Sequence, residues 1–312
     1  MNFGIIIHYG IYSFYEYDYD YDYMNRAKRQ RKSQNSSDWY FGRLIDYNDF
    51  MPDIKSVKKN QINSNTCIID DYFENLDKIT TDENKVKEWV NIAKCKGASY
   101  IILTSKHHDG VLLFDSKSSS LRSKMDVCKV FSEACKKENI PFGFYYSWFE
   151  FGVPFTKTYF KTYCVPQLQE LLAYEPNYMW FDGDWKIKQK NIQKEIFEIV
   201  KDMKETKNII VNDRIGRDNS NEASYRVISD KFIPKSIHDI ISRQYMNNVG
   251  YSWGNQNNTT TQVSEYQSKS DIHNLCKEVG ELGGTLLINL CPNDESEIEK
   301  EDIESLQLLI QN

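Results

Sequence analysis

Short apolar runs alternate with amphipathic segments along most of this chain. The first run, Phe3–Ile7, is continuous and rich in β-branched residues, which is typical of a strand buried on both faces of a sheet. Similar runs predict further strands at Tyr100–Thr104, Pro141–Tyr146, Tyr178–Asp182, Ile209–Val211 and Thr285–Leu290. Apolar residues at helical spacing predict helices at Lys85–Lys96, Val127–Lys137, Val165–Ala173, Ile192–Met203, Ile272–Leu282 and Ile298–Ile310.

Strands that alternate with helices predict an α/β fold with a parallel sheet. The pattern favours a (β/α)8 TIM-like barrel, regular or distorted, with residues 1–312 as a single domain. A barrel of about 250 residues with loop additions suits this length. An open, doubly wound sheet is the alternative. The chain has no GxGxxG motif after a strand and no Walker loop, which weakens an interpretation as a nucleotide-binding protein.

The stretch Tyr178–Trp185 reads Tyr-Met-Trp-Phe-Asp-Gly-Asp-Trp and places a carboxylate at the end of an apolar run. We expect a buried strand that delivers Asp182 into a cleft, with a backbone turn at Gly183. Carbohydrate sites favour acids that are flanked by indole rings, so Trp185 is a candidate substrate contact. The alternative is an ordinary Asp-Gly turn with a solvated aspartate.

Histidines follow two of the predicted strands. His8 ends the first, although a lone histidine is more often a satisfied core or surface residue. His107 and His108 follow the second, and adjacent residues on a strand point to opposite faces, so both enter one cleft only if the backbone turns there. Asp109-Gly110 supplies such a turn. Zinc ligands are usually spaced two or four residues apart, so neutral imidazoles that bind hydroxyls suit this pair better than a metal.

Residues 15–37 form a low-complexity segment in which tyrosine alternates with acidic residues before a cluster of Arg and Lys. Acids at every second position without an apolar face predict an exposed loop insertion. A nuclear-localisation signal is a weaker interpretation of the basic cluster. Asp38-Trp39-Tyr40 follows, and its aromatic pair suits either the wall of a sugar site or a core contact.

Composition narrows the class of protein. The 312 residues are 40% hydrophobic and 14% aromatic, which is enough for a sizeable core. The net charge of -6 argues against a nucleic-acid partner. The sequence has no apolar run of about 18 residues, so we expect no membrane span.

Cysteine usage and the first residues suggest a compartment. Seven scattered cysteines without CxxC spacing predict reduced, mostly buried thiols rather than a disulfide framework or a zinc site. The amino-terminal residues lack the features of a signal peptide. We therefore expect a cytoplasmic protein.

Five collinear blocks resemble the α-L-fucosidases of glycoside hydrolase family 29, especially the animal-type members. They cover nearly the whole chain, and Lys106-His107-His108-Asp109-Gly110 is identical to the family's KHHDG. The other blocks are Phe3-Gly4-Ile5-Ile6-Ile7-His8-Tyr9-Gly10, Asp38-Trp39, Trp180-Phe181-Asp182-Gly183-Asp184-Trp185, and Val211-Asn212-Asp213-Arg214 together with Gly283-Gly284-Thr285-Leu286-Leu287-Ile288-Asn289-Leu290.

The resemblance implies hydrolysis of terminal α-linked L-fucose with retention of configuration, without a metal or cofactor. It implies fucosylated glycans or glycoconjugates as partners, and it places the nucleophile at Asp182. The family's sugar-binding residues match His8, Trp39, His107, His108 and Tyr145. A retaining mechanism also needs a second carboxyl group about 5 to 5.5 Å from the first, which serves as acid and then as base.

The family's acid/base glutamate is not found at its expected place. Counting back from Ser252-Trp253-Gly254 leads to Gln244, or to Arg243 if the loop is one residue longer, and neither side chain exchanges a proton as the mechanism requires. Loss of a general acid typically costs about 10² to 10⁴ in rate. Tyr9, Cys291 and Glu295 are further departures from the family pattern, and the chain ends where the family's C-terminal β-sandwich would begin.

Two functional hypotheses therefore stay open. The first is a working retaining fucosidase in which another carboxylate is the acid/base, with Glu222, Asp239, Glu265 and Glu150 as candidates. The second is a pseudoenzyme that binds fucosylated glycans without cleaving them, because Gln244 replaces the acid/base.

Overall fold

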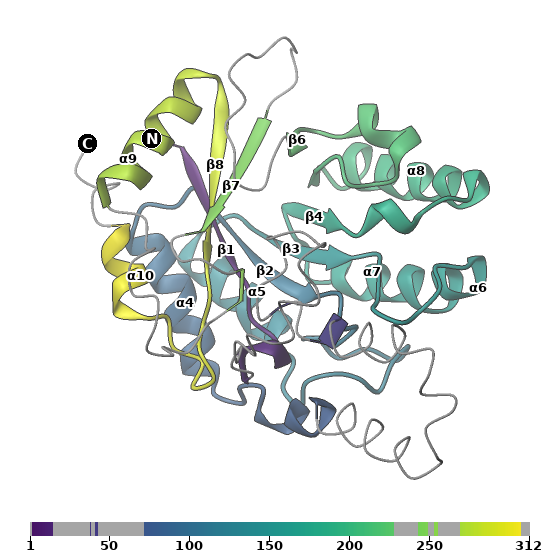
Figure 1. Cartoon of the computed structure of the whole chain (residues 1–312), viewed down its shortest axis with the longest axis horizontal. Coiled ribbons are helices and arrows are strands. Elements are labelled where there is room, and N and C mark those ends of the chain that lie inside the picture. The colour runs from purple at the N-terminus through teal and green to yellow at the C-terminus, as the bar shows by residue number, and fades with distance from the viewer. Residues whose placement is uncertain are drawn as a thin grey trace, which may run out of the picture.

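The computed structural model describes residues 2–14, 38, 41–42, 72–227, 243–248, 253–254 and 269–306. Strands and helices alternate along this part of the chain (Figure 1). The strands are β1 (Phe3–Ile7), β2 (Tyr100–Lys106), β3 (Phe142–Ser147), β4 (Tyr178–Asp182), β5 (Ile210–Val211), β6 (Arg226–Val227), β7 (Arg243–Asn248) and β8 (Gly284–Leu290). The α-helices are α4 (Glu83–Cys95), α5 (Val127–Glu138), α6 (Lys157–Tyr159), α7 (Val165–Leu172), α8 (Lys190–Glu205), α9 (Lys269–Glu281) and α10 (Lys300–Ser305).

The strands form one parallel sheet in the order β5-β4-β3-β2-β1-β8-β7-β6. Its two edges meet where Asn212 and Tyr225 form a parallel bridge and the Ser224 amide donates to the Val211 carbonyl at 2.8 Å. The sheet is therefore a (β/α)8 barrel, as predicted. An open, doubly wound sheet would leave these two edges apart, so that alternative is wrong.

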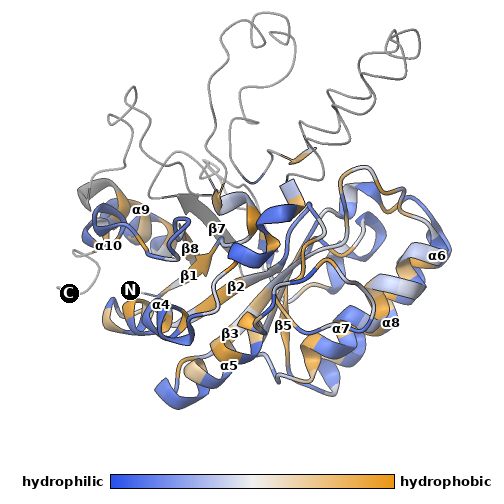
Figure 2. Ribbon diagram, turned by 90° about the horizontal axis from the view of Figure 1, so that it is seen from below, coloured by the Kyte–Doolittle hydropathy of each residue, from blue (hydrophilic) through white to orange (hydrophobic). Residues whose placement is uncertain are grey.

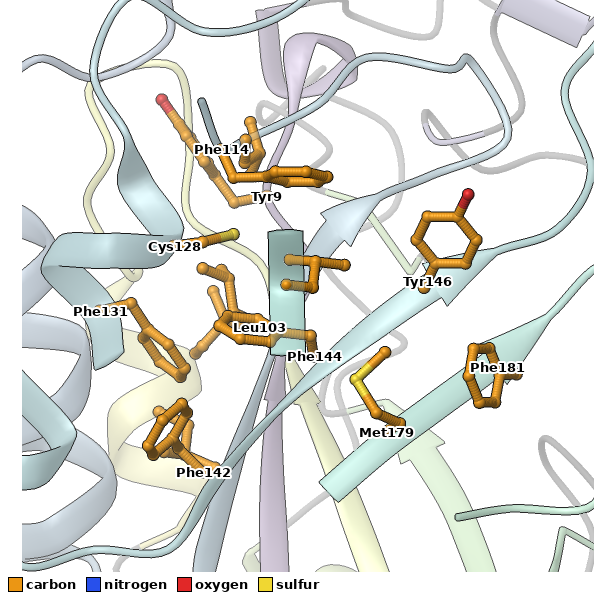
Figure 3. Close-up of a cluster of buried hydrophobic side chains, with 14 of the residues drawn as sticks. Tyr9, Leu103, Phe114, Cys128, Phe131, Phe142, Phe144, Tyr146, Met179 and Phe181 are labelled. Carbon is orange, nitrogen blue, oxygen red and sulfur yellow. The ribbon is translucent and has the colours of Figure 1, made fainter. Parts of the chain in front are cut away.

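Alternate residues of β1 to β4 and of β8 pack on opposite sides of the barrel wall. Ile5, Leu103, Phe144 and similar residues belong to the larger core between strands and helices. Phe142 and Phe144 of β3 lie 6.1 and 6.2 Å from the Phe131 ring of α5, between ring centroids (Figure 3). A smaller cluster fills the barrel interior and comprises Ile6, Tyr100, Ile102, Tyr145, Trp180, Tyr225 and Leu287. This alternation decides which side chains can enter a site inside the barrel.

The helices cover the outside of the barrel. Helices α4, α5, α7 and α8 lie along the outer side of the strands (Figure 2). Asp82 and Asp126 cap α4 and α5, since each carboxylate accepts from a backbone amide of the first helical turn. No helix in the described ranges is long and apolar enough to cross a membrane.

The structure confirms the predicted strands and helices, although the last helix is α10 (Lys300–Ser305) and residues 307–310 of its predicted range lie outside the described residues. It also adds elements that the sequence pattern missed. Strands β6 and β7 were not predicted, because β6 has only two residues and β7 reads Arg-Gln-Tyr-Met-Asn-Asn without an apolar run. The helix predicted at Val165 is preceded by α6 and a π-helical turn, Phe160–Cys164. The expected loop insertion at residues 15–37 lies outside the described residues.

Candidate active site

A cavity opens at the carboxyl ends of the strands, where barrel enzymes carry their chemistry. It encloses about 440 Å³ including its open mouth. The lining residues in the described part of the chain come from several strand ends. They are His8, Asp38, His107, His108, Tyr145, Trp180, Asp182, Trp185, Arg214 and Trp253.

Asp182 is the carboxylate at the end of β4, and it is 8% exposed. It lies two residues after Trp180, so it points to the same inner side of the barrel wall. The Tyr145 hydroxyl donates to Oδ2 at 2.8 Å, and Arg214 Nη1 donates to Oδ1 at 2.8 Å. The Gly183 amide donates to Oδ1 at 2.9 Å. This aspartate is therefore held by its partners, and the alternative of a solvated Asp-Gly turn is wrong.

Competing effects set the pKa of Asp182. Burial raises it, but the nearby Arg214 guanidinium, His108 and the hydrogen bonds from Tyr145 and Arg214 outweigh burial. The pKa is therefore below the ordinary value for an aspartate. An ionised carboxylate in a cavity is a group that can attack an electrophilic carbon.

Arg214 reaches Asp182 from the segment after β5. Asn212 extends the pairing of β5 with β4, since its side-chain amide donates to the Phe181 carbonyl and accepts from the Phe181 amide at 2.9 and 2.8 Å. Trp148 Nε1 donates to the Arg214 carbonyl at 3.0 Å. The guanidinium lies 4.8 Å from the Trp180 ring centroid. These contacts fix the cation against both the carboxylate and an aromatic face.

Both histidines of the His107-His108 pair line the cavity. Strand β2 ends at Lys106 after a register shift against β3, and the backbone then turns at Gly110, whose φ of 81° suits glycine. The turn lets two consecutive side chains enter one site, which a continuing strand would prevent. Both His107 and His108 therefore enter one cavity, which the sequence pattern alone had left open.

Hydrogen bonds determine which nitrogen of His108 carries the proton. The Ser147 hydroxyl donates to the Phe149 carbonyl at 2.7 Å, so its oxygen accepts from His108 Nδ1 at 2.7 Å. His108 Nε2 then presents its lone pair, 3.7 Å from Asp182 Oδ2. His107 Nε2 lies 3.8 Å from Asp38 Oδ2, and its Nδ1 is buried without a hydrogen-bond partner among the described residues.

His8 follows the last residue of β1, and a hydrogen bond from its Nδ1 also fixes which nitrogen carries the proton. Its Nδ1 donates to the side-chain carbonyl of Asn289, whose amide in turn donates to the Trp253 carbonyl at 2.9 Å. Burial lowers the pKa of His8 and of His108 to about 4, and it lowers the pKa of His107 well below its ordinary value. All three imidazoles are therefore neutral at neutral pH, and each has a nitrogen that can accept and one that can donate.

Aromatic rings form one wall of the cavity. Trp180, Tyr145 and His107 stack in a row, with 5.4 Å between successive centroids and interplanar angles of 16°. Trp253 lies 5.7 Å from the His8 ring, and Trp185 lies 5.6 Å from the His108 ring. A flat apolar wall beside neutral polar groups is suited to a sugar, which has an apolar face and a hydroxyl edge.

The structure brings together every predicted site residue that it describes, except for the expected acid/base. His8, His107, His108, Tyr145, Asp182 and Trp185 all line the cavity, while Trp39 lies outside the described residues. The sequence assigned no role to Asp38, Arg214, Trp180 or Trp253. The Asp38-Trp39 and Asn212-Asp213-Arg214 blocks were the available signals for two of them.

The register of β7 argues against Gln244 as the acid/base position. Asn248 pairs with Asn289 at the level of the site, whereas Gln244 pairs with Thr285. A strand rises about 3.3 Å per residue. The Gln244 backbone, four residues before Asn248, therefore lies about 13 Å from Asn248 toward the opposite end of the barrel. Arg243 is one residue further away.

Glu150 and Glu222 do not line the cavity in the part of the chain that the structure describes. Glu150 Oε1 lies 2.7 Å from Lys106 Nζ and accepts from the Tyr159 hydroxyl at 2.7 Å. Glu222 ends a 3₁₀ helix, Arg217–Glu222, between β5 and β6. Asp239 and Glu265 lie outside the described residues.

Comparisons with known proteins place the chain among fucosidases. The family model described as alpha-L-fucosidase matches residues 1–310. Tissue alpha-L-fucosidase of Homo sapiens is 28% identical over 229 residues, covering 67% of this chain and 49% of that protein. Alpha-L-fucosidase of Dictyostelium discoideum is 25% identical over 346 residues, covering 98% of this chain and 67% of that protein. The chain thus spans about half the length of the human relative.

Solved structures show the same fold. Alpha-L-fucosidase from Vibrio sp. strain EJY3 matches with a TM-score of 0.77 at 19% identity, covering 99% of this chain and 53% of that one. The Thermotoga maritima alpha-fucosidase in complex with fucose matches with a TM-score of 0.72 at 23% identity, covering 99% and 71%.

Proposed function

The chain belongs to the alpha-L-fucosidase family, and we propose that it is a retaining exo-glycosidase that releases terminal α-L-fucose, with Asp182 as the nucleophile. The observation that carries this proposal is the ionised Asp182 inside a cavity with three neutral imidazoles. Arg214 and Tyr145 hold one carboxylate oxygen each, so the side chain is oriented before substrate binds.

The cavity walls support a sugar as the ligand. Neutral His8 and His108 can each accept a hydrogen bond from a hydroxyl group, because Nδ1 of each donates within the protein and leaves the Nε2 lone pair for a ligand. Neutral His107 also has one donor and one acceptor nitrogen. The Trp180 and Tyr145 rings offer an apolar surface on the neighbouring side. The site therefore suits a small, neutral, hydroxyl-rich ring, such as the L-fucose that the family membership implies.

We assign the general acid and base to Asp38. It is 2% exposed, and it is the one carboxylate besides Asp182 along the described lining of the cavity. Asp38 Oδ2 lies 3.8 Å from His107 Nε2, and Asp182 Oδ2 lies 3.7 Å from Nε2 of the adjacent His108. Retaining enzymes need two carboxyl groups of this kind on opposite sides of the scissile bond.

The reaction proceeds in two displacements at the anomeric carbon. In the first, Asp182 forms a bond to the anomeric carbon while the glycosidic bond breaks, and the protonated Asp38 gives its proton to the leaving oxygen. In the second, the Asp38 carboxylate removes a proton from water, which attacks the anomeric carbon and releases Asp182. L-Fucose leaves with its original anomeric configuration.

A pseudoenzyme that binds fucosylated glycans without cleaving them is the second candidate. Its motivation is the replacement of the family's acid/base glutamate by Gln244 or Arg243. The pairing of Gln244 with Thr285, four residues before Asn289, supports a search for the acid/base elsewhere. The presence of Asp38 in the cavity favours the hydrolase.

Turnover of two substrates separates these candidates. We expect the wild type to cleave 4-nitrophenyl α-L-fucoside and a fucosyl disaccharide, and Asp182→Ala to lose at least about 10³-fold on both. Asp38→Asn should lose about 10² to 10⁴ in kcat/KM on the disaccharide, whose leaving group needs a proton, and much less in kcat/KM on the aryl fucoside. Its kcat on the aryl fucoside should still fall, because the second step lacks its base. Added azide, which attacks without a base, should restore aryl-fucoside turnover by Asp38→Asn. Fucose binding by calorimetry without turnover of either substrate would instead establish the pseudoenzyme.

A further inference from the structure

Trp185 is an exposed aromatic residue at the rim of the cavity. Its exposure is 42%, and it is the one large hydrophobic residue of such exposure in the described ranges that lines the cavity. The others are Val153, Tyr163, Ile210 and Leu282. An indole left in water beside a polar site costs hydrophobic free energy, so it marks a surface that a ligand can cover.

The local backbone holds Trp185 in place. Gly183 has a φ of 78°, and a Cβ at this position would lie 2.6 Å from the Phe149 Cβ. Glycine therefore allows the loop after β4 to approach the loop after β3 closely. The 3₁₀ turn Asp184–Lys186 follows and carries the indole.

Two neighbours extend the exposed indole into a small platform. The Phe149 ring lies 6.1 Å from the Trp185 ring, and Lys186 Nζ lies 5.0 Å from the Phe149 centroid. Lys186 is exposed and Phe149 is half-buried. Aromatic faces beside a donor of hydrogen bonds provide the two kinds of contact that a pyranose ring uses.

The platform lies nearer the mouth of the cavity than Asp182 and the residues around it. His8, His107, Tyr145 and Asp182 are each at most 8% exposed, whereas Trp185 lies at the mouth. An exo-acting enzyme holds its terminal sugar at the deep end, because the carboxylate that attacks the anomeric carbon is there. The group on the other side of the scissile bond must then leave through the mouth, past Trp185.

We propose that Trp185, Phe149 and Lys186 form a subsite for the leaving group, and that its ligand is a neutral pyranose stacked on the indole. This inference rests on the proposed function, since it requires fucose at the deep end.

Binding of two ligands to the wild type and to Trp185 variants tests the subsite. The probes are L-fucose, which fills only the deep end, and a sulfur-linked fucosyl-galactose disaccharide, which resists cleavage and reaches the rim. Calorimetry should show that Trp185→Ala weakens the disaccharide about tenfold more than it weakens L-fucose. Trp185→Phe, which keeps an aromatic face, should retain most of the difference in affinity between the two ligands.

Tyr163→Ala is the matched control, because Tyr163 is 39% exposed and does not line the cavity. It should leave both affinities unchanged. Equal weakening of both ligands by Trp185→Ala, or no weakening of either, would overturn the subsite and leave the proposed function intact. If the wild type bound neither ligand, the proposed function and the subsite would both be wrong.

Discussion

Neutral imidazoles and an ionised carboxylate share one buried cavity, and burial acts on the two kinds of group differently. For His8 and His108, burial disfavours the charged form and lowers the pKa to about 4. For Asp182, burial favours the neutral form, but Arg214 and Tyr145 stabilise the charged one. The Arg214 contact is therefore what allows an ionised carboxylate to coexist with neutral hydrogen-bonding groups.

These pKa values predict how sugar binding depends on pH. A lowered histidine pKa keeps the imidazole neutral above that value, so L-fucose affinity should be nearly constant from pH 7.5 to about 5. It should fall as the pH passes through about 4, because protonated His8 and His108 lose their acceptor nitrogens. Calorimetric titration with L-fucose across this pH range measures the affinity.

The control for this profile is His273→Gln, since His273 lies on α9 and does not line the cavity. It should give the wild-type profile. A midpoint near 6.5, the ordinary value for histidine, would contradict neutral, buried imidazoles at the site.

Individual residues differ in how far the sequence could predict them. The position of Asp182 follows from strand alternation, because an inward Trp180 requires an inward residue two positions later. Its partner Arg214 could not be derived in this way, since the contact spans 32 residues and depends on how β5 pairs with β4. Alternation is a local property, whereas a partner on another strand depends on register.

At the scale of elements, a buried charge network joins the ends of β2 and β3 behind the site. Lys106 is fully buried, and its Nζ lies 2.7 Å from Glu150 Oε1 and donates to the Ser147 carbonyl at 3.1 Å and the Tyr159 hydroxyl at 2.8 Å. Ser147 in turn accepts from His108. The network therefore fixes the loop that orients one of the imidazoles lining the cavity.

Removing one partner of this pair should destabilise the protein. Glu150→Ala leaves the Lys106 ammonium buried without its counter-ion, so we expect a loss of about 3 kcal/mol in the free energy of unfolding, measured with urea. Asp115→Ala removes the exposed partner of Arg122 and should cost about 1 kcal/mol or less. Equal losses for the two variants would contradict a structural role for the Lys106–Glu150 pair.

Elements with a strong apolar pattern were predictable, and those without one were not. Strands β1 to β4 are buried along nearly their whole length, so their sequences are continuous apolar runs. Strand β7 is polar in sequence, and its place in the barrel follows from pairing with β8 and β6.

At the scale of the whole molecule, barrel closure gathers the site. The cavity takes residues from the carboxyl ends of β1, β2, β3 and β4 and from the segment after β5. In a parallel barrel these ends lie at one face, so the sequence could predict that polar strand ends meet. The strand pattern did not predict that Asp38 joins them, because Asp38 follows a low-complexity segment rather than a predicted strand, and the Asp38-Trp39 block was the available signal.

The central claim is that Asp182 attacks the anomeric carbon of fucose, and covalent trapping tests it most directly. A 2-fluoro-fucosyl fluoride should form the glycosyl-enzyme and then hydrolyse slowly, because the fluorine at C2 destabilises the transition state of the second step. Peptide mass mapping should find one 2-fluorofucosyl group on the peptide that contains Asp182, and none in Asp182→Ala. An adduct on a different carboxylate, or no adduct although the compound binds in the cavity, would contradict the account.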